Sequence, residues 1–120
     1  IKKLTEAERE DMSTQFDKAM KAAWSIFNND AFRKRRNIYD RRKPINKALF
    51  ETLSVWLAKC TNNERQQLVA KKSIVQRLFV ELNNDEKFYY ALSSGTGQKE
   101  SVNYRHRKIK EMIETVLKEK

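Results

Sequence analysis

Hydrophobic residues recur at spacings of three and four residues along most of this chain, which is the pattern of helices that bury one face. In the first such stretch, Thr5 and Glu8 form a capping-box pair that marks a helix start. The polar cluster at residues 28–30 marks its end, so we predict a helix of about six turns. Its expected apolar face comprises Met12, Phe16, Met20, Ala23, Trp24 and Phe27.

A second helix is predicted to begin at Pro44, because a proline at the first helical position forfeits no hydrogen bond. Its apolar stripe is the broadest in the chain, which predicts the most buried helix. That stripe comprises Ile45, Leu49, Phe50, Leu53, Trp56, Leu57 and Cys60. Only a narrow polar strip remains, comprising Lys47, Glu51, Ser54 and Ala58.

Polar clusters divide the rest of the chain into further helices. Thr61, with the two asparagines after it, stops the second helix and caps a new one. The remaining elements are a helix over 68–82 with a break near 70–73, a short helix after 83–85, a loop at 93–97 and a helix over 99–118. The expected buried face of the last helix comprises Val102, His106, Ile109, Ile113 and Val116.

The composition agrees with helices throughout. Two glycines and one proline in 120 residues are too few for the many turns of a sandwich or barrel. We therefore predict an all-α fold, a single compact bundle of five to six helices over residues 1–120. No apolar run is long enough to span a membrane, and the single Cys60 fits a reducing, cytoplasmic setting. The chain begins with Ile1, so we expect it to be part of a longer protein.

Positive charge is concentrated in one short segment. The formal net charge is +10, and residues 31–47 hold eight basic groups against the single acid Asp40. Residues 1–30, in contrast, carry five basic and six acidic groups. Such a distribution indicates a local anionic partner.

The basic segment contains the candidate phosphate-binding residues. Guanidinium groups donate paired hydrogen bonds to phosphate oxygens, and the amides of a helix start after Pro44 would add positive potential. The candidates are Arg33, Arg35, Arg36, Arg41, Arg42, Lys43, Asn46 and Lys47. The alternative to phosphate binding is that these side chains form a solvated charged surface, in which Arg33 has a structural role beside Phe32. A second, weaker cluster comprises Arg105, Arg107, Lys108 and Lys110; salt-dependent binding would follow if the two adjoin in space.

No pattern of catalytic or metal-binding residues emerges. His106 is the only histidine, which excludes a site with two histidine ligands. A nucleophilic pair of Cys60 with His106 is open, but both lie on apolar faces and core packing is favoured. Glu51 is more consistent with a salt bridge to Lys47 than with acid–base work. The loop at residues 93–97 lacks the lysine of a phosphate loop and is interpreted as a connector. We expect no catalytic residue, metal or cofactor.

Several stretches resemble one known family. These are Ala31 to Arg33, Arg41 to Glu51, Ser93 to Gly97 and the helix start at Val102 to Arg105, and Pro-Ile-Asn-Lys-Ala-Leu-Phe-Glu is the most specific of them. They are similar to the helical C-terminal region of the family called domain of unknown function 262, which includes GmrSD-type restriction proteins. The resemblance implies a prokaryotic protein, often from restriction or phage defence. The matching positions are Arg33, Arg41, Arg42, Asn46, Lys47 and Glu51.

The resemblance leaves two functions open. The family's N-terminal domain carries an Asp-Gly-Gln-Gln-Arg motif linked to nucleotide hydrolysis, and that motif does not occur here. The first hypothesis is a non-catalytic module that binds or positions DNA through phosphate contacts from the basic segment. The second is a structural module that packs on an N-terminal nucleotidase domain of the same protein, with Arg41 or Arg42 turned toward its nucleotide.

Overall fold

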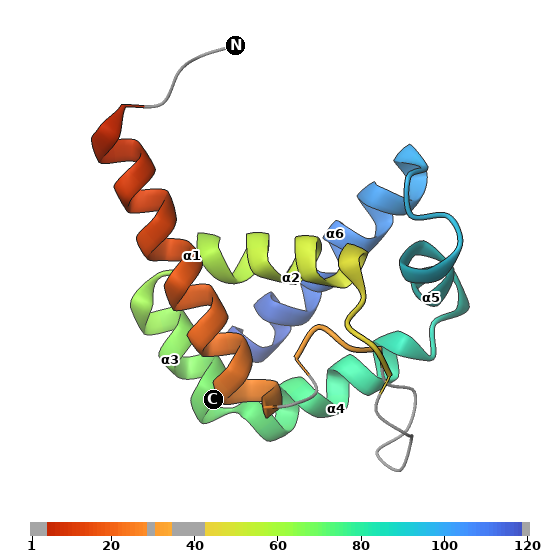
Figure 1. Ribbon diagram of the computed structural model, residues 1–120. Coiled ribbons are helices and arrows are strands. Elements are labelled where there is room, and N and C mark those ends of the chain that lie inside the picture. The colour runs from red at the N-terminus through yellow and green to blue at the C-terminus, as the bar shows by residue number, and fades with distance from the viewer. Residues whose placement is uncertain (1–4, 29–30, 35–42, 119–120) are drawn as a thin grey trace.

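The computed structural model describes residues 5–28, 31–34 and 43–118 (Figure 1). Over these ranges it contains six α-helices and no strand longer than an isolated bridge. The helices are α1 (Glu6–Phe27), α2 (Lys47–Lys59), α3 (Asn62–Ala70), α4 (Lys72–Asn83), α5 (Glu86–Ser93) and α6 (Lys99–Lys118). The prediction of an all-α bundle of five to six helices is confirmed.

Local caps explain where most of the helices begin. Thr5 Oγ1 accepts a hydrogen bond from the Glu8 amide at 3.1 Å at the start of α1. Thr61 and Glu64 form a complete capping box at the start of α3. Asp85 accepts from two amides at the start of α5. These starts, and the break between α3 and α4 at Lys71, follow the sequence pattern, although α3 begins several residues earlier than predicted.

The predicted start of α2 at Pro44 is wrong. The helix begins at Lys47, and Asn46 is its cap, with Oδ1 accepting from the Leu49 amide at 2.9 Å. The residues before Asn46 are held outside the helix because Ile45 pairs with Arg33 in an isolated antiparallel bridge. Ile45 is consequently 59% exposed and does not belong to the apolar stripe.

The predicted apolar face of α1 is only half correct. Met12 and Trp24 are each 57% exposed and Phe16 is 43% exposed. Burial in this helix begins at Ala19 and continues through Ala22, Ala23, Ile26 and Phe27. The other helices pack against this second half, and the N-terminal half extends beyond them (Figure 1).

The core lies where α2 meets α1 and α6. Leu49, Leu53 and Leu57 of α2 are at most 2% exposed, and Ile109 and Val116 of α6 are fully buried. Aromatic side chains extend the core toward α4 and the segment before α2. Their edge-to-face pairs are Phe27 with Phe79 at 5.2 Å and Phe32 with Phe50 at 4.9 Å between ring centroids.

A buried arginine closes the end of α2. Arg65 of α3 is only 5% exposed, and its guanidinium donates to the carbonyls of Leu57 at 2.8 Å and Cys60 at 2.6 Å. It also donates to side-chain oxygens of Gln15 and Asn62. The last carbonyls of a helix have no partner within the helix, so this one side chain satisfies them and ties α1, α2 and α3 together.

We predict that Arg65→Met destabilises the fold by about 3 kcal/mol or more, because each buried carbonyl left without a donor costs roughly 1–3 kcal/mol. Urea unfolding followed by circular dichroism measures this. Arg77→Met, at an exposed position of α4, is the matched control and is expected to stay close to the native midpoint. Equal effects of the two substitutions would contradict the assigned role of Arg65.

Candidate nucleic-acid interface

The structure describes the two ends of the basic segment, residues 31–34 and 43–47. Arg33, Lys34, Lys43 and the start of α2 are placed by the structure, whereas Arg35, Arg36, Arg41 and Arg42 lie outside the described residues. At these ends, the Asn46 amide donates to the Phe32 carbonyl at 2.8 Å. The Arg33 guanidinium donates to the Lys43 carbonyl. The chain therefore enters and leaves the basic segment at the same place.

This anchoring point lies against α5. Lys34 Nζ donates to Ser93 Oγ at 2.9 Å and lies 4.5 Å from the centre of the Tyr89 ring. Asn46 Nδ2 donates to the Leu92 carbonyl at 2.7 Å. The side chains of Arg33 and Asn46 are thus bonded to carbonyl groups of the fold. For Arg33 this agrees with the alternative of a structural role. Lys47 is exposed and Lys43 half-buried, so among the predicted site residues that the structure describes, these two lysines are best placed for a ligand.

Arg105 does not belong to the surface cluster in which the sequence placed it. It is 4% exposed, and its guanidinium donates to Thr52 Oγ1 at 3.2 Å and to the carbonyls of Ala91 and Thr96 at 3.2 and 2.8 Å. Arg105 lies one turn before Ile109 on the buried face of α6, which also explains why His106 is only partly buried. Through Thr96, the loop at residues 93–97 acts as an anchor for this side chain.

Gly95 lets that loop pack closely on α5. A Cβ atom at this position would lie 2.5 Å from Tyr90 Cε1 and 2.9 Å from Ser101 Oγ. A larger residue at position 95 would require the side chains of Tyr90 and Ser101, or the loop itself, to move.

Five further cations gather around two aromatic rings. Around Tyr104, the charged atoms of Lys87, Arg107 and Lys108 lie 4.6, 5.2 and 5.5 Å from the ring centre. Lys59 and Lys110 lie 4.7 and 5.7 Å from the centre of the Trp56 ring. We call these five cations the α2–α5–α6 basic surface.

The sequence analysis missed part of this surface. Lys59 and Lys87 come from α2 and α5 and were not grouped with the cations of α6. A local signal existed for some of the pairs, because Lys59 follows Trp56 by three residues and Arg107 and Lys108 follow Tyr104 by three and four. No local pattern connects Lys87 with Tyr104, since only the packing of α5 on α6 brings them together.

Tyr104 is fixed at its hydroxyl end. Its hydroxyl donates to Asp85 Oδ2, and burial together with this bond raises the pKa of Tyr104 to about 12. Burial acts to raise the pKa of Asp85, but the bonds from Tyr104 and from the amides of Phe88 and Lys87 outweigh it and lower that pKa below 3.8. At neutral pH the carboxylate is ionised and the phenol neutral, which holds the ring in place.

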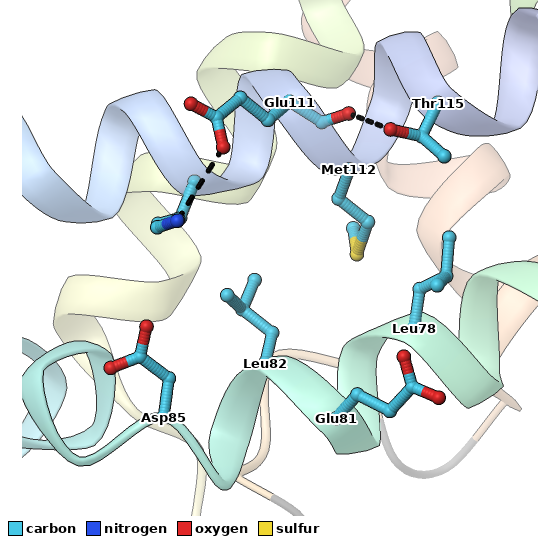
Figure 2. A pocket seen from close by; sticks show the side chains of 8 residues that line it. Leu78, Glu81, Leu82, Asp85, Glu111, Met112 and Thr115 are labelled. Carbon is cyan, nitrogen blue, oxygen red and sulfur yellow. Dashed lines mark hydrogen bonds and ion pairs between the residues drawn. The ribbon is translucent and has the colours of Figure 1, made fainter.

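A shallow groove between α4 and α6 borders the basic surface (Figure 2). Its volume is about 300 Å³, and Leu78, Leu82 and Met112 line it. Glu81, Asp85 and Glu111 add carboxylates, and the ion pair of Glu111 with Lys108 at 3.6 Å lies at its edge (Figure 2). Negative charge repels phosphate, so this groove marks a limit of the candidate interface.

Trp56 is hydrogen-bonded to both Cys60 and His106. Its Nε1 donates to His106 Nδ1 at 2.9 Å, and its carbonyl accepts from Cys60 Sγ at 3.2 Å. Burial, and then the charge of Glu64, raises the pKa of Cys60 to about 11, so the thiol stays protonated. Burial, with the charges of Arg105 and Lys59, lowers the pKa of His106. Both residues act as packing and hydrogen-bonding groups here, in agreement with the core interpretation.

In the part of the chain that the structure describes, no three histidine, cysteine or acidic side chains come together as metal ligands would. Over the same residues, no helix combines the length and apolar character needed to cross a membrane. Comparisons with family models, with curated proteins and with solved structures find no match to this chain.

We predict that stability falls as the pH drops below 6.5, because the folded protein holds His106 neutral while the unfolded chain protonates it. His106→Gln keeps an acceptor for Trp56 without a titrating group, so it is expected to lose this part of the pH dependence. Urea unfolding at about pH 7.5 and about pH 5.5 for both proteins measures the difference. An identical change in the two proteins would contradict the assignment.

Proposed function

We propose that this domain is a non-catalytic basic module of a prokaryotic restriction or phage-defence type protein, and that it binds or positions DNA through phosphate contacts. The observation that carries the proposal is the anchoring of the basic segment at both ends. Arg33 and Ile45 pair, so residues 34–43, with six basic side chains and one acidic one, leave and rejoin the fold at a single place on α5.

Cations on the helices support the same function. The α2–α5–α6 basic surface adds five cations from helices that pack on one another. Lysine and arginine contacts to phosphates release counterions, which gives affinity without sequence selectivity. A module of this kind fits a protein whose specificity or chemistry lies in another domain, as the resemblance to the domain of unknown function 262 family implies.

The environments of Cys60 and His106, the candidate nucleophile and base, support the non-catalytic part of the proposal. Cys60 is a buried thiol with a raised pKa, and the Nδ1 of His106 is occupied by Trp56. Neither arrangement activates a nucleophile, which needs a lowered thiol pKa or a free base beside it.

We predict duplex DNA binding with a steep salt dependence. About six phosphate contacts lower the affinity about a thousandfold between about 50 and about 200 mM salt. Changing Arg35, Arg36, Arg41 and Arg42 to glutamine is expected to weaken binding and flatten this slope. Fluorescence anisotropy with a labelled duplex, repeated across the salt series, gives both quantities.

The matched control removes the same charge elsewhere. Lys21, Lys72, Arg77 and Lys99 are exposed on α1, α4 and α6, and their joint change to glutamine also removes four positive charges. If this control flattened the slope as much as the segment variant, binding would reflect net charge only. The basic segment would then lose its assigned role.

One observation favours the alternative, a module that packs on an N-terminal nucleotidase domain. The N-terminal half of α1 exposes Met12 and Phe16, whose chemistry suits a protein contact. The same turns carry Glu6, Glu8 and Glu10, which would repel DNA. This half of α1 is therefore the better surface for a protein partner, and the basic surface for DNA.

The full-length protein separates the two functions. If the domain contacts DNA, Arg42→Ala is expected to reduce DNA affinity and leave nucleotide hydrolysis unchanged. If the basic segment instead faces a nucleotidase domain, hydrolysis is lost while DNA affinity is retained. Parallel hydrolysis and anisotropy assays on the one variant measure both, and the second result would overturn the leading proposal.

A further inference from the structure

Trp56 is held rigidly at the junction of α2 and α6. Its indole Nε1 donates to His106 Nδ1 at 2.9 Å, and the two rings meet edge to face at 6.3 Å between centroids. The ring is only partly buried, because Trp56 lies at the margin of the core and not inside it. The fold therefore presents an aromatic ring whose orientation is already fixed.

The side chains over this ring are flexible cations. Lys59 Nζ lies 4.7 Å and Lys110 Nζ 5.7 Å from the ring centre, and both residues are exposed. A cation over an exposed aromatic ring is worth about 0.5–1 kcal/mol, whereas a nucleic-acid base stacked on such a ring is worth about 1–3 kcal/mol. A base can thus replace a lysine over the ring, and the displaced ammonium group remains within reach of a phosphate beside that base.

The charge around Trp56 favours a polyanion. Lys59 and Lys110, the two cations over the ring, are both exposed, one at the end of α2 and the other in the middle of α6. Lys110 also meets Glu114 at 3.8 Å, but an exposed ion pair of this kind contributes at most about 1 kcal/mol and is readily exchanged for a phosphate. Burial, and then the charges of Arg105 and Lys59, lower the pKa of His106, while the charge of Glu51 acts to raise it by a smaller amount.

We propose that Trp56 stacks on an unpaired base while Lys59 and Lys110 bind the adjacent phosphates, so that the ligand class of this surface is single-stranded nucleic acid. The inference rests on the proposed phosphate-binding function and specifies the strand form that it selects. Bases within a duplex are stacked on one another and have no free face for Trp56. Phosphate contacts alone would not separate the two forms.

The other aromatic ring on the basic surface is less suitable. Tyr104 has three cations around it, and its hydroxyl is bound to Asp85. The charges of Asp85 and Glu111 act on Tyr104. Both carboxylates line the groove between α4 and α6 (Figure 2). A base with its phosphates would meet negative charge there, which leaves Trp56 as the stacking site.

The experiment uses the fluorescence of Trp56 itself. Trp24 is the only other tryptophan and is 57% exposed on α1, so Trp24→Phe leaves Trp56 as the single reporter. This variant is titrated with a labelled single-stranded oligothymidylate and, separately, with the corresponding duplex. We expect tighter single-strand binding, with indole emission quenched at the oligonucleotide concentrations that change the anisotropy.

Two variants locate the contacts. Trp56→Leu in otherwise native protein removes the aromatic face. It is expected to weaken single-strand binding about tenfold and to leave duplex binding nearly unchanged, with circular dichroism confirming the fold. Joint change of Lys59 and Lys110 to glutamine is expected to flatten the single-strand salt slope by about 1.4, the contribution of two phosphate contacts. Lys21 and Lys72 changed to glutamine are the control for charge.

The outcomes distinguish this inference from the proposed function. Duplex binding as tight as single-strand binding, or unchanged Trp56 emission on saturation, would overturn the single-strand assignment and leave phosphate binding intact. An unchanged salt slope in the Lys59 and Lys110 variant would overturn their phosphate contacts. Failure to bind either form would overturn both the inference and the proposed function.

Discussion

The carbonyl groups at the C-terminal ends of α2 and α5 lie inside the bundle, and two buried guanidinium groups satisfy them. Arg65 reaches the end of α2 and Arg105 the end of α5 and the loop after it. Buried carbonyls without donors would each destabilise the fold, so these two side chains permit short connections between closely packed helices. Arg105 also bonds to Thr52, which sets α6 against α2 and so brings His106 to Trp56.

The features that the sequence predicts well are those decided within a few residues. The caps at Thr5, Thr61 and Asp85 each depend on a hydrogen bond to an amide two or three residues away. The spacing of apolar residues likewise gives the bounds of the last helix, from Lys99 to Lys118. Such signals do not need the rest of the fold, so the all-α class and the order of helices follow from the pattern.

Features decided by distant residues were mispredicted for a physical reason. Met12 and Phe16 fit the apolar stripe of α1, but the described helices reach that half only at its end, where Phe16 meets Phe50 of α2 and stays 43% exposed. Arg105 sits in a basic run and looks like a surface residue, yet its partners are 9, 14 and 53 positions away. The clustering of cations around Tyr104 and Trp56 also depends on how α2, α5 and α6 pack. Spacing along one helix cannot supply that information.

The pairing of Arg33 with Ile45 has a consequence for how such a protein can change over evolution. Because the two ends of the basic segment are joined at the bundle, residues can be inserted between them without moving any helix. Doubling the length of a closed loop costs only about 0.6 kcal/mol of closure entropy. Mutation can therefore vary the number and order of arginines there, and with them the strength of anion binding, while selection on the core continues independently.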